Sequence, residues 1–220
     1  MNELRARIRE AAFPAALTGA GISAPSGIPT FQGSYRGRPL RSYLTRDYME
    51  EHPLDFFDLY CDMVKWCEKQ PNPAHYALKE LGVRVITQNI DGLHAKAGTD
   101  ALEMHGSLRF VLCHGCSWRE DAQAFAARFA AARARSSGEA MAALHCPRCG
   151  RRIDTEVVLY SDAVRHLDEA MELAASSDLF LVIGTSLETY PAAGLPDVAR
   201  QAGAEIVMIN DDCVGAFRED

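Results

Sequence analysis

Four of the seven cysteines occur in two Cys-x-x-Cys pairs, Cys113/Cys116 and Cys146/Cys149. Each pair forms a tight turn that can place two thiolates on one metal ion, and two such turns complete a tetrahedral shell. Because four thiolates leave no open position, we expect a structural Zn²⁺ rather than a catalytic one. Redox or incidental thiols are the less favoured alternative. The odd cysteine count and the metal-type pairs favour a reducing, cytoplasmic compartment.

His105, in the stretch "ALEMHGSL", follows a short apolar run and stands directly before a glycine. Imidazole titrates near neutral pH, so this side chain is a candidate general base. A lone histidine is more often a structural residue. The catalytic interpretation therefore depends on what the fold places beside it.

Polar side chains gather in "ITQNIDGLH", residues 86–94, where an apolar run ends. Gln88, Asn89 and Asp91 would stand at the carboxyl end of a parallel strand, which is where α/β sheets bind ligands. An amide and a carboxylate there can hydrogen-bond a small amide or a ribose. The alternative is a helix cap, which by itself is the simpler explanation for an Asn or Asp at this place.

Two later apolar runs, at 179–184 and 204–209, also end in small polar residues. Both would bring these groups to the same edge of a parallel sheet, although either one alone could be an ordinary turn. The residues concerned are Gly184, Thr185, Ser186, Asn210 and Asp211.

The stretch "TGAGISA", residues 18–24, follows the first apolar run and has the form G-x-G-x-x-A. Glycines allow a tight turn and a close approach of backbone to a pyrophosphate, which can rest on a helix N-terminus. A plain strand-to-helix turn is about as good an explanation. The acidic residue that usually ends a second strand about 20 residues later is missing, so a dinucleotide is not held as in a standard dehydrogenase.

Five short apolar runs are typical of buried parallel strands, and stretches with helical spacing separate most of them. This alternation predicts an α/β fold with a doubly wound parallel sheet. The expected strands are 13–18, 83–87, 156–160, 179–184 and 204–209, and the expected helices are 3–12, 53–69, 73–81 and 162–176.

Length and charge limit the other classes of function. A chain of 220 residues suits one domain, or one domain with a small insert. A formal net charge of −7 argues against nucleic acid as the main partner. No apolar run is long enough to span a bilayer, and the N-terminus lacks the apolar region of a signal peptide, so we expect no membrane partner.

Together these motifs resemble the sirtuin family of NAD-dependent protein deacylases. Besides the two cysteine pairs, the matches follow the family's order over most of the chain. They are "GAGISAPSGIPTFQG", "PNPAH", "TQNIDGLHAKAG", "HGSL", "VVLYSD", "GTSLETYP" and "IN". One such match would be weak evidence, but the ordered series identifies the chain as similar to this family.

The resemblance implies a large Rossmann-like, NAD-binding domain formed by residues 1–112 and 150–220. It implies a small zinc-binding module at 113–149, with part of 34–70 as a second helical insert. The pattern of the chain agrees, because residues 113–149 interrupt the alternation of strands and helices with an Ala- and Arg-rich helix between the two cysteine pairs.

The resemblance further implies that NAD is consumed as a co-substrate rather than used as a hydride carrier. The acyl-lysine oxygen would attack the ribose anomeric carbon as nicotinamide leaves, with Asn89 and Asp91 lining the nicotinamide pocket. His105 would then take a proton from a ribose hydroxyl, and the products would be nicotinamide, O-acyl-ADP-ribose and free lysine. The residues implied to bind NAD are Gly19, Ala20, Gly21, Ser23, Ile28, Pro29, Phe31, Gln32, Gln88, Asn89, Ile90, Asp91, His105, Gly184, Thr185, Ser186, Asn210 and Asp211.

For the second substrate, the resemblance places an acyl-lysine peptide between "VVLYSD" and "LETYP", where it would add a strand by main-chain pairing. Family members that remove acidic acyl groups carry Tyr-x-x-Arg on the helix after the first loop, and the aligned residues here are Tyr60 and Met63. A succinyl carboxylate would lack its cation, so we expect neutral acyl groups to be preferred. The residues implied to contact the substrate are Tyr60, Met63, Val158, Leu159, Tyr160, Glu188 and Thr189.

One departure from the family pattern bears directly on activity. The family stretch "GIPxFRG" is "GIPTFQG" here, so Gln32 replaces an arginine that helps to position NAD. Glutamine forms hydrogen bonds but has neither the charge nor the fork of a guanidinium. Arg36 or Arg38 could supply the cation instead. A mono-ADP-ribosyltransferase or NAD glycohydrolase on the same fold, and a non-catalytic NAD- or ADP-ribose-binding regulator, therefore stay open as alternatives.

Overall fold

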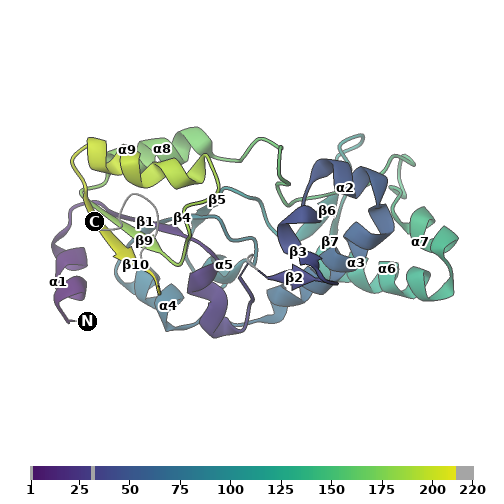
Figure 1. Cartoon of the computed structure of the whole chain (residues 1–220), viewed down its shortest axis with the longest axis horizontal. Coiled ribbons are helices and arrows are strands. Elements are labelled where there is room, and N and C mark those ends of the chain that lie inside the picture. Colours follow the sequence, from purple (N-terminus) through teal and green to yellow (C-terminus); the bar gives the residue numbers. More distant parts are fainter. Residues whose placement is uncertain (1, 31–32, 212–220) are drawn as a thin grey trace.

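A five-stranded parallel sheet forms the centre of the larger lobe in the computed structural model, which describes residues 2–30 and 33–211 (Figure 1). All four strand pairs in this sheet are parallel. The strands, in spatial order, are β10 (Glu205–Ile209), β9 (Leu179–Ile183), β1 (Pro14–Thr18), β4 (Arg84–Thr87) and β5 (Ala101–Glu103). The predicted α/β class with a parallel sheet is confirmed.

Alternation along β1 explains why both faces of the sheet carry helices. Ala15 and Leu17 pack into a core with α8 (Leu167–Ser176) and α9 (Leu195–Gln201), whereas Ala16 packs into a core with α1 (Asn2–Glu10) and α4 (Pro73–Glu80). Figure 1 shows the two helix pairs on opposite sides of the sheet. Because the apolar side chains of β1 face both ways, the strand reads as a continuous apolar run. Among residues 2–30 and 33–211, no helix has the length and apolar character needed to cross a membrane.

Two element predictions are wrong. Residues 156–160 were expected to form a parallel strand, but they run as irregular chain, apart from one bridge that pairs Tyr160 with Thr45. Their apolar side chains are instead buried outside the sheet, because Val157 and Leu159 lie in the core of the smaller lobe. The predicted helix at 162–176 begins only at Leu167. A short apolar run has the same sequence pattern whether its side chains are buried within a sheet or between other elements.

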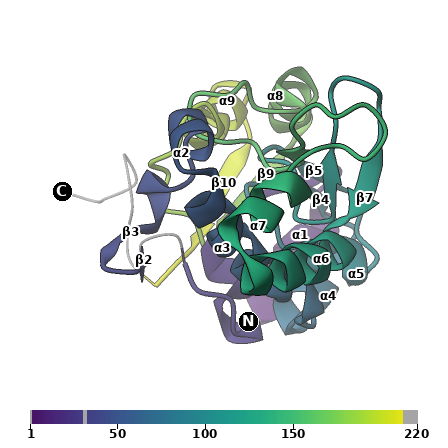
Figure 2. The ribbon, with the colours of Figure 1, turned by 90° about the vertical axis from the view of Figure 1, so that its right-hand side faces the viewer.

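The smaller lobe joins the helical segment after the first loop to the cysteine segment (Figure 2). A single hydrophobic core runs through both, and in it the ring of Phe57 lies 5.4 Å from that of Phe125 and 6.0 Å from that of Phe129. The elements are η2 (Leu40–Ser42), α2 (Arg46–Glu51), α3 (Pro53–Val64), η3 (Lys65–Glu68), β6 (Phe110–Leu112), β7 (Arg119–Asp121), α6 (Ala122–Arg135), α7 (Ser137–Ala143) and β8 (Asp154–Thr155).

The limits of the two domains stay a prediction. The structure adds that β6 and β8 flank residues 113–149 and pair with each other in the order β7-β6-β8. A short hairpin, β2 (Ser34–Tyr35) and β3 (Arg38–Pro39), leads from the first loop into the smaller lobe. The chain therefore passes from one hydrophobic core to the other through these segments.

Candidate functional site

Two glycine turns meet where β1 and β9 end. After β1, the chain enters η1 (Ala20–Ser26), and its Gly21 N–H donates to the Gly184 carbonyl at 2.7 Å. A Cβ on Gly21 would stand 2.6 Å from the Gly184 Cα, and a Cβ on Gly184 would stand 2.3 Å from the Ile22 nitrogen. Gly184 also has φ +62°, a backbone conformation that side chains rarely adopt. The close approach of two backbones at this edge requires glycine.

Gly184→Ala is expected to destabilise the fold more than an alanine at a glycine with the same backbone angle and open space. Gly82 is the matched control, because its φ is +68° and no atom lies within 4 Å of a Cβ built on it. Backbone strain alone costs about 1–2 kcal/mol, and the clash with Ile22 adds to it. Urea unfolding measures both free energies; equal losses for Gly184→Ala and Gly82→Ala would contradict this packing.

A buried hydrogen-bond network ties the end of β4 to the first loop. The Asn89 side-chain amide donates to the Gly19 carbonyl and to the Ser23 hydroxyl, both at 3.1 Å. Ser23 in turn donates to the Asp91 carboxylate at 2.7 Å. The other oxygen of that carboxylate accepts the Leu93 N–H at 2.9 Å, at the start of α5 (Leu93–Lys96). One oxygen of Asp91 therefore bonds backbone at the start of α5, although the N-cap of that helix is Gly92, and the network also ties Asn89 to the first loop.

A small cavity opens beside this network. Its volume is about 10 Å³, which is room for one water molecule. The lining residues are Ala20, Ile28, Trp66, Asn89, Ile90 and Asp91. The structure thus brings five of the sequence-predicted residues to one place. Trp66 was not among them, since nothing in the spacing of α3 and η3 separates it from a core aromatic residue.

His105 is held by one ring nitrogen and leaves the other unused. Its Nδ1 lies 3.0 Å from the Gln88 carbonyl oxygen, so Nδ1 carries the proton and donates it there. Its Nε2 is shielded from solvent and has no hydrogen-bond partner within residues 2–30 and 33–211. Burial lowers the pKa of His105 below its ordinary value of 6.5, against a smaller opposing effect of the Gln88 carbonyl. A neutral imidazole with a free, buried Nε2 is suited to accept a proton.

Hydrogen bonds also connect the ends of β4, β9 and β10. The Thr185 hydroxyl donates to the Gln88 side-chain oxygen at 2.7 Å. The Asn210 amide donates to the Thr185 carbonyl at 2.9 Å. Gln88, Thr185 and Asn210, which are all predicted to bind NAD, are therefore linked at one edge of the sheet. Pro29 and Asp211 are exposed, and Phe31 and Gln32 lie outside the residues that the structure describes.

The two cations considered as substitutes for an arginine at position 32 are engaged elsewhere. Arg36 lies 3.5 Å from both Asp55 and Asp58 on α3. The Arg38 guanidinium lies over the rings of Tyr43 and Tyr48, 5.3 and 5.4 Å from their centroids. Both side chains hold the β2–β3 hairpin to the smaller lobe, so neither contact serves the NAD edge.

The predicted peptide-contacting segment is fastened on one side. The Val158 N–H donates to the His105 carbonyl at 2.9 Å, and the Tyr160 N–H donates to the Leu44 carbonyl at 2.8 Å. Tyr160 is exposed, as is Glu188 across the predicted peptide site. Main-chain pairing of a peptide with this segment stays a prediction.

An ion-pair clamp follows this segment. Arg46, at the start of α2, contacts Asp162 at 2.6 Å and Asp154 at 2.8 Å. Asp162 also accepts the Leu159 N–H at 3.2 Å. The aspartate of "VVLYSD" thus has a structural partner in Arg46, which no spacing in the sequence revealed.

Three of the predicted substrate residues, Tyr60, Met63 and Leu159, are buried rather than at an open surface. Tyr60 and Met63 are 2% and 1% exposed and belong to the core of the smaller lobe. The Tyr60 hydroxyl donates to the Phe110 carbonyl at 3.3 Å. In this arrangement neither Tyr60 nor Met63 is presented to an acyl group, because each is packed among aromatic and aliphatic neighbours.

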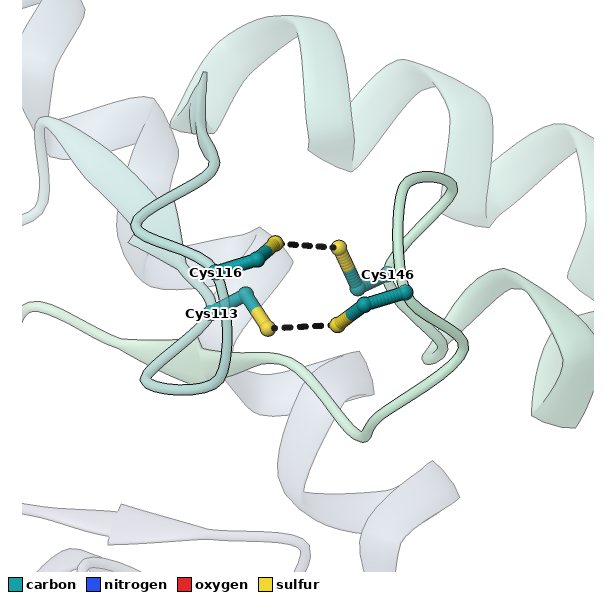
Figure 3. Close-up of side chains that lie close together, drawn as sticks. Cys113, Cys116 and Cys146 are labelled. Atoms are coloured by element: carbon teal, nitrogen blue, oxygen red, sulfur yellow. Dashed lines mark hydrogen bonds between the residues drawn. The ribbon is translucent and has the colours of Figure 1, made fainter.

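Four cysteine sulfurs converge between two turns of the smaller lobe (Figure 3). Cys113 and Cys149 lie 3.5 Å apart at Sγ, as do Cys116 and Cys146, and all four sulfurs lie within 4.8 Å of one another. Zn–S bonds of about 2.3 Å in a tetrahedron place sulfurs about 3.8 Å apart, so the set fits Zn²⁺. Since every ligand comes from the protein, such an ion would serve structure rather than catalysis.

The fold and the site define a class of protein: a doubly wound α/β protein that binds a dinucleotide at the carboxyl edge of its sheet and carries a separate four-cysteine module. The model of the Sir2 family matches residues 19–191. The chain belongs to this family, whose members are the sirtuins.

Curated relatives of the chain are named as NAD-dependent deacetylases and deacylases. The chain is 37% identical to "NAD-dependent protein deacetylase 1" of Pyrobaculum aerophilum, over 96% of this chain and 84% of the relative. It is 39% identical to "NAD-dependent protein deacylase 2" of Archaeoglobus fulgidus, over 88% of this chain and 78% of the relative.

Solved structures agree as well. One similar structure is Sir2Tm bound to a propionylated peptide, with a TM-score of 0.83, 30% identity, and coverage of 97% of this chain and 87% of that one. Another is a Sir2 homolog–NAD complex, with a TM-score of 0.83, 33% identity, and coverage of 97% and 84%.

Proposed function

We propose that the protein removes acyl groups from lysine side chains, with NAD consumed as co-substrate. The observation that carries this proposal is the free, buried Nε2 of a neutral His105, held through Nδ1 by Gln88 at the edge that also contains Asn89. The family's relatives are named NAD-dependent protein deacylases and deacetylases, which supports the same reaction.

The residues present fit NAD at this edge. The two glycine turns meet without room for a Cβ, so backbone rather than side chain would face the diphosphate. When bound, NAD supplies an electrophilic ribose carbon as its nicotinamide leaves. Asn89 and Asp91, fixed by Gly19 and Ser23, would hold the nicotinamide side, and a preorganised pocket of this kind stabilises developing charge.

His105 performs the proton step of the proposal. Its Nε2 would take a proton from a ribose hydroxyl, so that this oxygen attacks the acyl carbon while that carbon is still bonded to the lysine nitrogen. The Nδ1–H bond to Gln88 fixes the ring during this step and holds the tautomer. One water molecule would then be consumed to break the bond between the acyl carbon and the lysine nitrogen, and the products would be nicotinamide, O-acyl-ADP-ribose and free lysine.

Mass spectrometry of an acetyl-lysine peptide incubated with NAD tests the proposal. Deacylation predicts an unmodified peptide together with O-acetyl-ADP-ribose. The specific reason to consider a second candidate, a mono-ADP-ribosyltransferase or NAD glycohydrolase, is the glutamine at position 32. That candidate predicts a peptide or protein whose mass rises by an ADP-ribosyl group, or free ADP-ribose with the acetyl group left in place. NAD binding without any product would instead favour a regulator.

Neutral acyl groups are the proposed substrates. The position that carries an arginine in family members acting on acidic acyl groups is Met63 here, and it is buried among apolar side chains. An acidic acyl group would therefore lack the arginine that pairs with its carboxylate in those family members. We expect acetyl to be removed faster than succinyl from one peptide sequence; the opposite order in a product assay would refute this preference.

Arg46→Ala is expected to weaken use of the peptide rather than of NAD. The clamp to Asp162 and Asp154 holds the segment that would pair with the peptide, so its loss should raise the peptide KM by roughly three- to tenfold, or about 0.7–1.4 kcal/mol. Steady-state kinetics with each substrate varied separates the two effects. Arg5→Ala, which removes an exposed ion pair with Glu80, is the control. An unchanged peptide KM would show that the clamp has no part in binding.

We also propose a cytoplasmic location and an acyl-lysine protein as partner. The described cysteines outside the zinc set are Cys61 and Cys67, both partly buried free thiols, and free thiols persist in a reducing compartment. One similar structure contains a propionylated peptide, which supports a peptide ligand of this type.

A further inference from the structure

The turn that carries His105 is fastened to the segment proposed to bind the peptide. The Val158 N–H donates to the His105 carbonyl at 2.9 Å, and the Arg165 N–H donates to the Met104 carbonyl at 2.9 Å. These two bonds fix the two peptide groups that flank His105. The backbone on both sides of the candidate general base is therefore held by residues 158–165 as well as by the sheet.

A close backbone contact follows at the next residue. Gly106 has φ +73°, and a Cβ built on it would stand 2.0 Å from the Glu156 carbonyl oxygen. The Gly106 N–H donates to the Glu103 carbonyl at 3.2 Å, which closes the turn at the end of β5. The Glu156 backbone thus lies directly against the turn that carries His105, and only glycine permits this approach.

The side chain of Glu156 adds a contact to the same turn. Its Oε2 accepts the Ser107 hydroxyl proton at 2.7 Å, and its Oε1 lies 3.6 Å from the Arg165 guanidinium. Ser107 is 1% exposed, and its oxygen also accepts the N–H and the Nε–H of Arg109 at 3.3 and 3.1 Å. A hydroxyl has one proton and two lone pairs, so these three bonds use everything that Ser107 offers. Glu156 therefore supplies the acceptor that this buried hydroxyl needs, two residues after His105.

We infer that Glu156 is a positioning residue, which holds His105 in place and couples it to the segment proposed to bind the acyl-lysine peptide. The inference rests on the proposed function. Glu156 would act through Gly106 and Ser107, because it belongs to the peptide segment while its contacts lie on the His105 turn. A peptide held by residues 156–160 would thereby keep Nε2 of His105 at the ribose hydroxyl. The residues that the sirtuin resemblance implies for either substrate do not include Glu156.

The expected consequence is selective, because His105 acts only after nicotinamide has left. Breaking the bond between nicotinamide and the ribose needs the acyl oxygen as attacking group and does not need the base. A displaced His105 would therefore slow the formation of deacylated peptide and leave the first bond cleavage intact. A displacement of about 1 Å can cost about 10²-fold in the rate of the step that it affects.

Two rates measured on the same protein test the inference. Entry of isotope-labelled nicotinamide into NAD, with acetyl-lysine peptide present, reports that the first bond breaks and forms again, whereas deacylated peptide reports the step of His105. Glu156→Ala is expected to lower deacylation by roughly 10- to 100-fold and to change the exchange by less than about threefold. An equal loss of both rates, or no loss of deacylation, would overturn the inference.

Two further variants test whether the hydrogen bond is responsible. Glu156→Gln keeps a side-chain carbonyl for the Ser107 hydroxyl, so its deacylation rate should stay within about threefold of wild type. Ser107→Ala removes the same bond from the other side and should reproduce the selective loss. Because the two alanine variants remove one bond, the loss in the double variant should exceed the larger single loss by less than about twofold. A slow Glu156→Gln, or additive losses in the double variant, would overturn the inference.

Glu120→Ala is the matched control. Glu120 is also a partly buried glutamate in an ion pair, with a side chain 22% exposed against 18% for Glu156, and its partner Arg128 lies in the cysteine module. We expect its deacylation rate to stay within about twofold of wild type, since a single ion pair of this kind contributes little. A fall as large as that of Glu156→Ala would overturn the specific role of Glu156.

The NMR signals of the His105 imidazole separate failure of this inference from failure of the proposed function. Their assignment comes from their loss in His105→Ala, and Glu156→Ala should shift them. Unshifted signals together with unchanged deacylation in Glu156→Ala refute the role of Glu156 and leave the proposed function standing. Shifted signals in Glu156→Ala, where the wild type deacylates no peptide, refute the proposed function and leave the positioning contact standing.

Discussion

His105→Ala is expected to lower the rate of deacylation by about 10²–10⁴-fold, the usual contribution of a general base. The reason is geometric: Nδ1 is committed to the Gln88 carbonyl, and Nε2 is buried at the NAD edge with no partner in the described part of the chain. The measurement is single-turnover formation of deacylated peptide. His52→Ala is the control, because His52 is exposed and lies in the smaller lobe. A rate within threefold of wild type for His105→Ala would remove the general base from the account.

The same residue sets the pH dependence. Burial disfavours the charged imidazolium, so the pKa of His105 lies below 6.5 and the neutral base form persists as pH falls to that value. We therefore expect kcat/KM to stay level from neutral pH down to about 6.5 and to decline only below it. An acid limb centred above 6.5 would contradict this environment for His105.

Removal of the metal is the second large effect that we expect. Cys113 and Cys146 are 1% and 2% exposed and form part of the smaller lobe's core, so losing their shared ion would loosen the packing around them. Structural zinc sites contribute directly to folding free energy. Cys146→Ser should lose the bound zinc and several kcal/mol of stability, and with it the lobe that carries Trp66 and the peptide clamp.

Zinc content per chain, measured by mass spectrometry of the metal, and thermal unfolding check this together. Cys61→Ser is the matched control, since Cys61 is a partly buried thiol outside the four-sulfur set. One zinc per chain in the wild type and in Cys61→Ser, with none in Cys146→Ser, is the expected result. Full zinc occupancy in Cys146→Ser would contradict a four-thiolate site.

Four of the five strands of the central sheet could be predicted from the sequence, because each of these four is a continuous apolar run between helical stretches. The same signal failed at residues 156–160, where Val157 and Leu159 are equally apolar but are buried in the core of the smaller lobe. A pattern of side chains reports burial, not the partner that buries them. The short strand β5 gave too little pattern to be recognised.

The site residues also fall into two groups: those that the sequence pattern located and those that only the fold brings together. Asn89, Asp91 and His105 could be located because they follow strand ends, where parallel sheets bind ligands. The clamp of Arg46 on Asp162 joins residues 116 positions apart, and Trp66 reaches the cavity from another lobe, so only the fold could bring them together. Conversely, Arg36 and Arg38 are near Gln32 in sequence, yet their contacts lie with Asp55, Asp58 and two tyrosines.

The most direct test of the central claim is the rate of nicotinamide release from NAD, with and without an acetyl-lysine peptide. The account predicts release that depends on the peptide, because the acyl oxygen is the attacking group, and release that is matched by O-acetyl-ADP-ribose formation. Gln32→Arg, measured in parallel, should raise this rate if the glutamine limits it, and should not change its dependence on peptide. Nicotinamide released at the same rate with no peptide present would contradict deacylation and identify the protein as an NAD glycohydrolase.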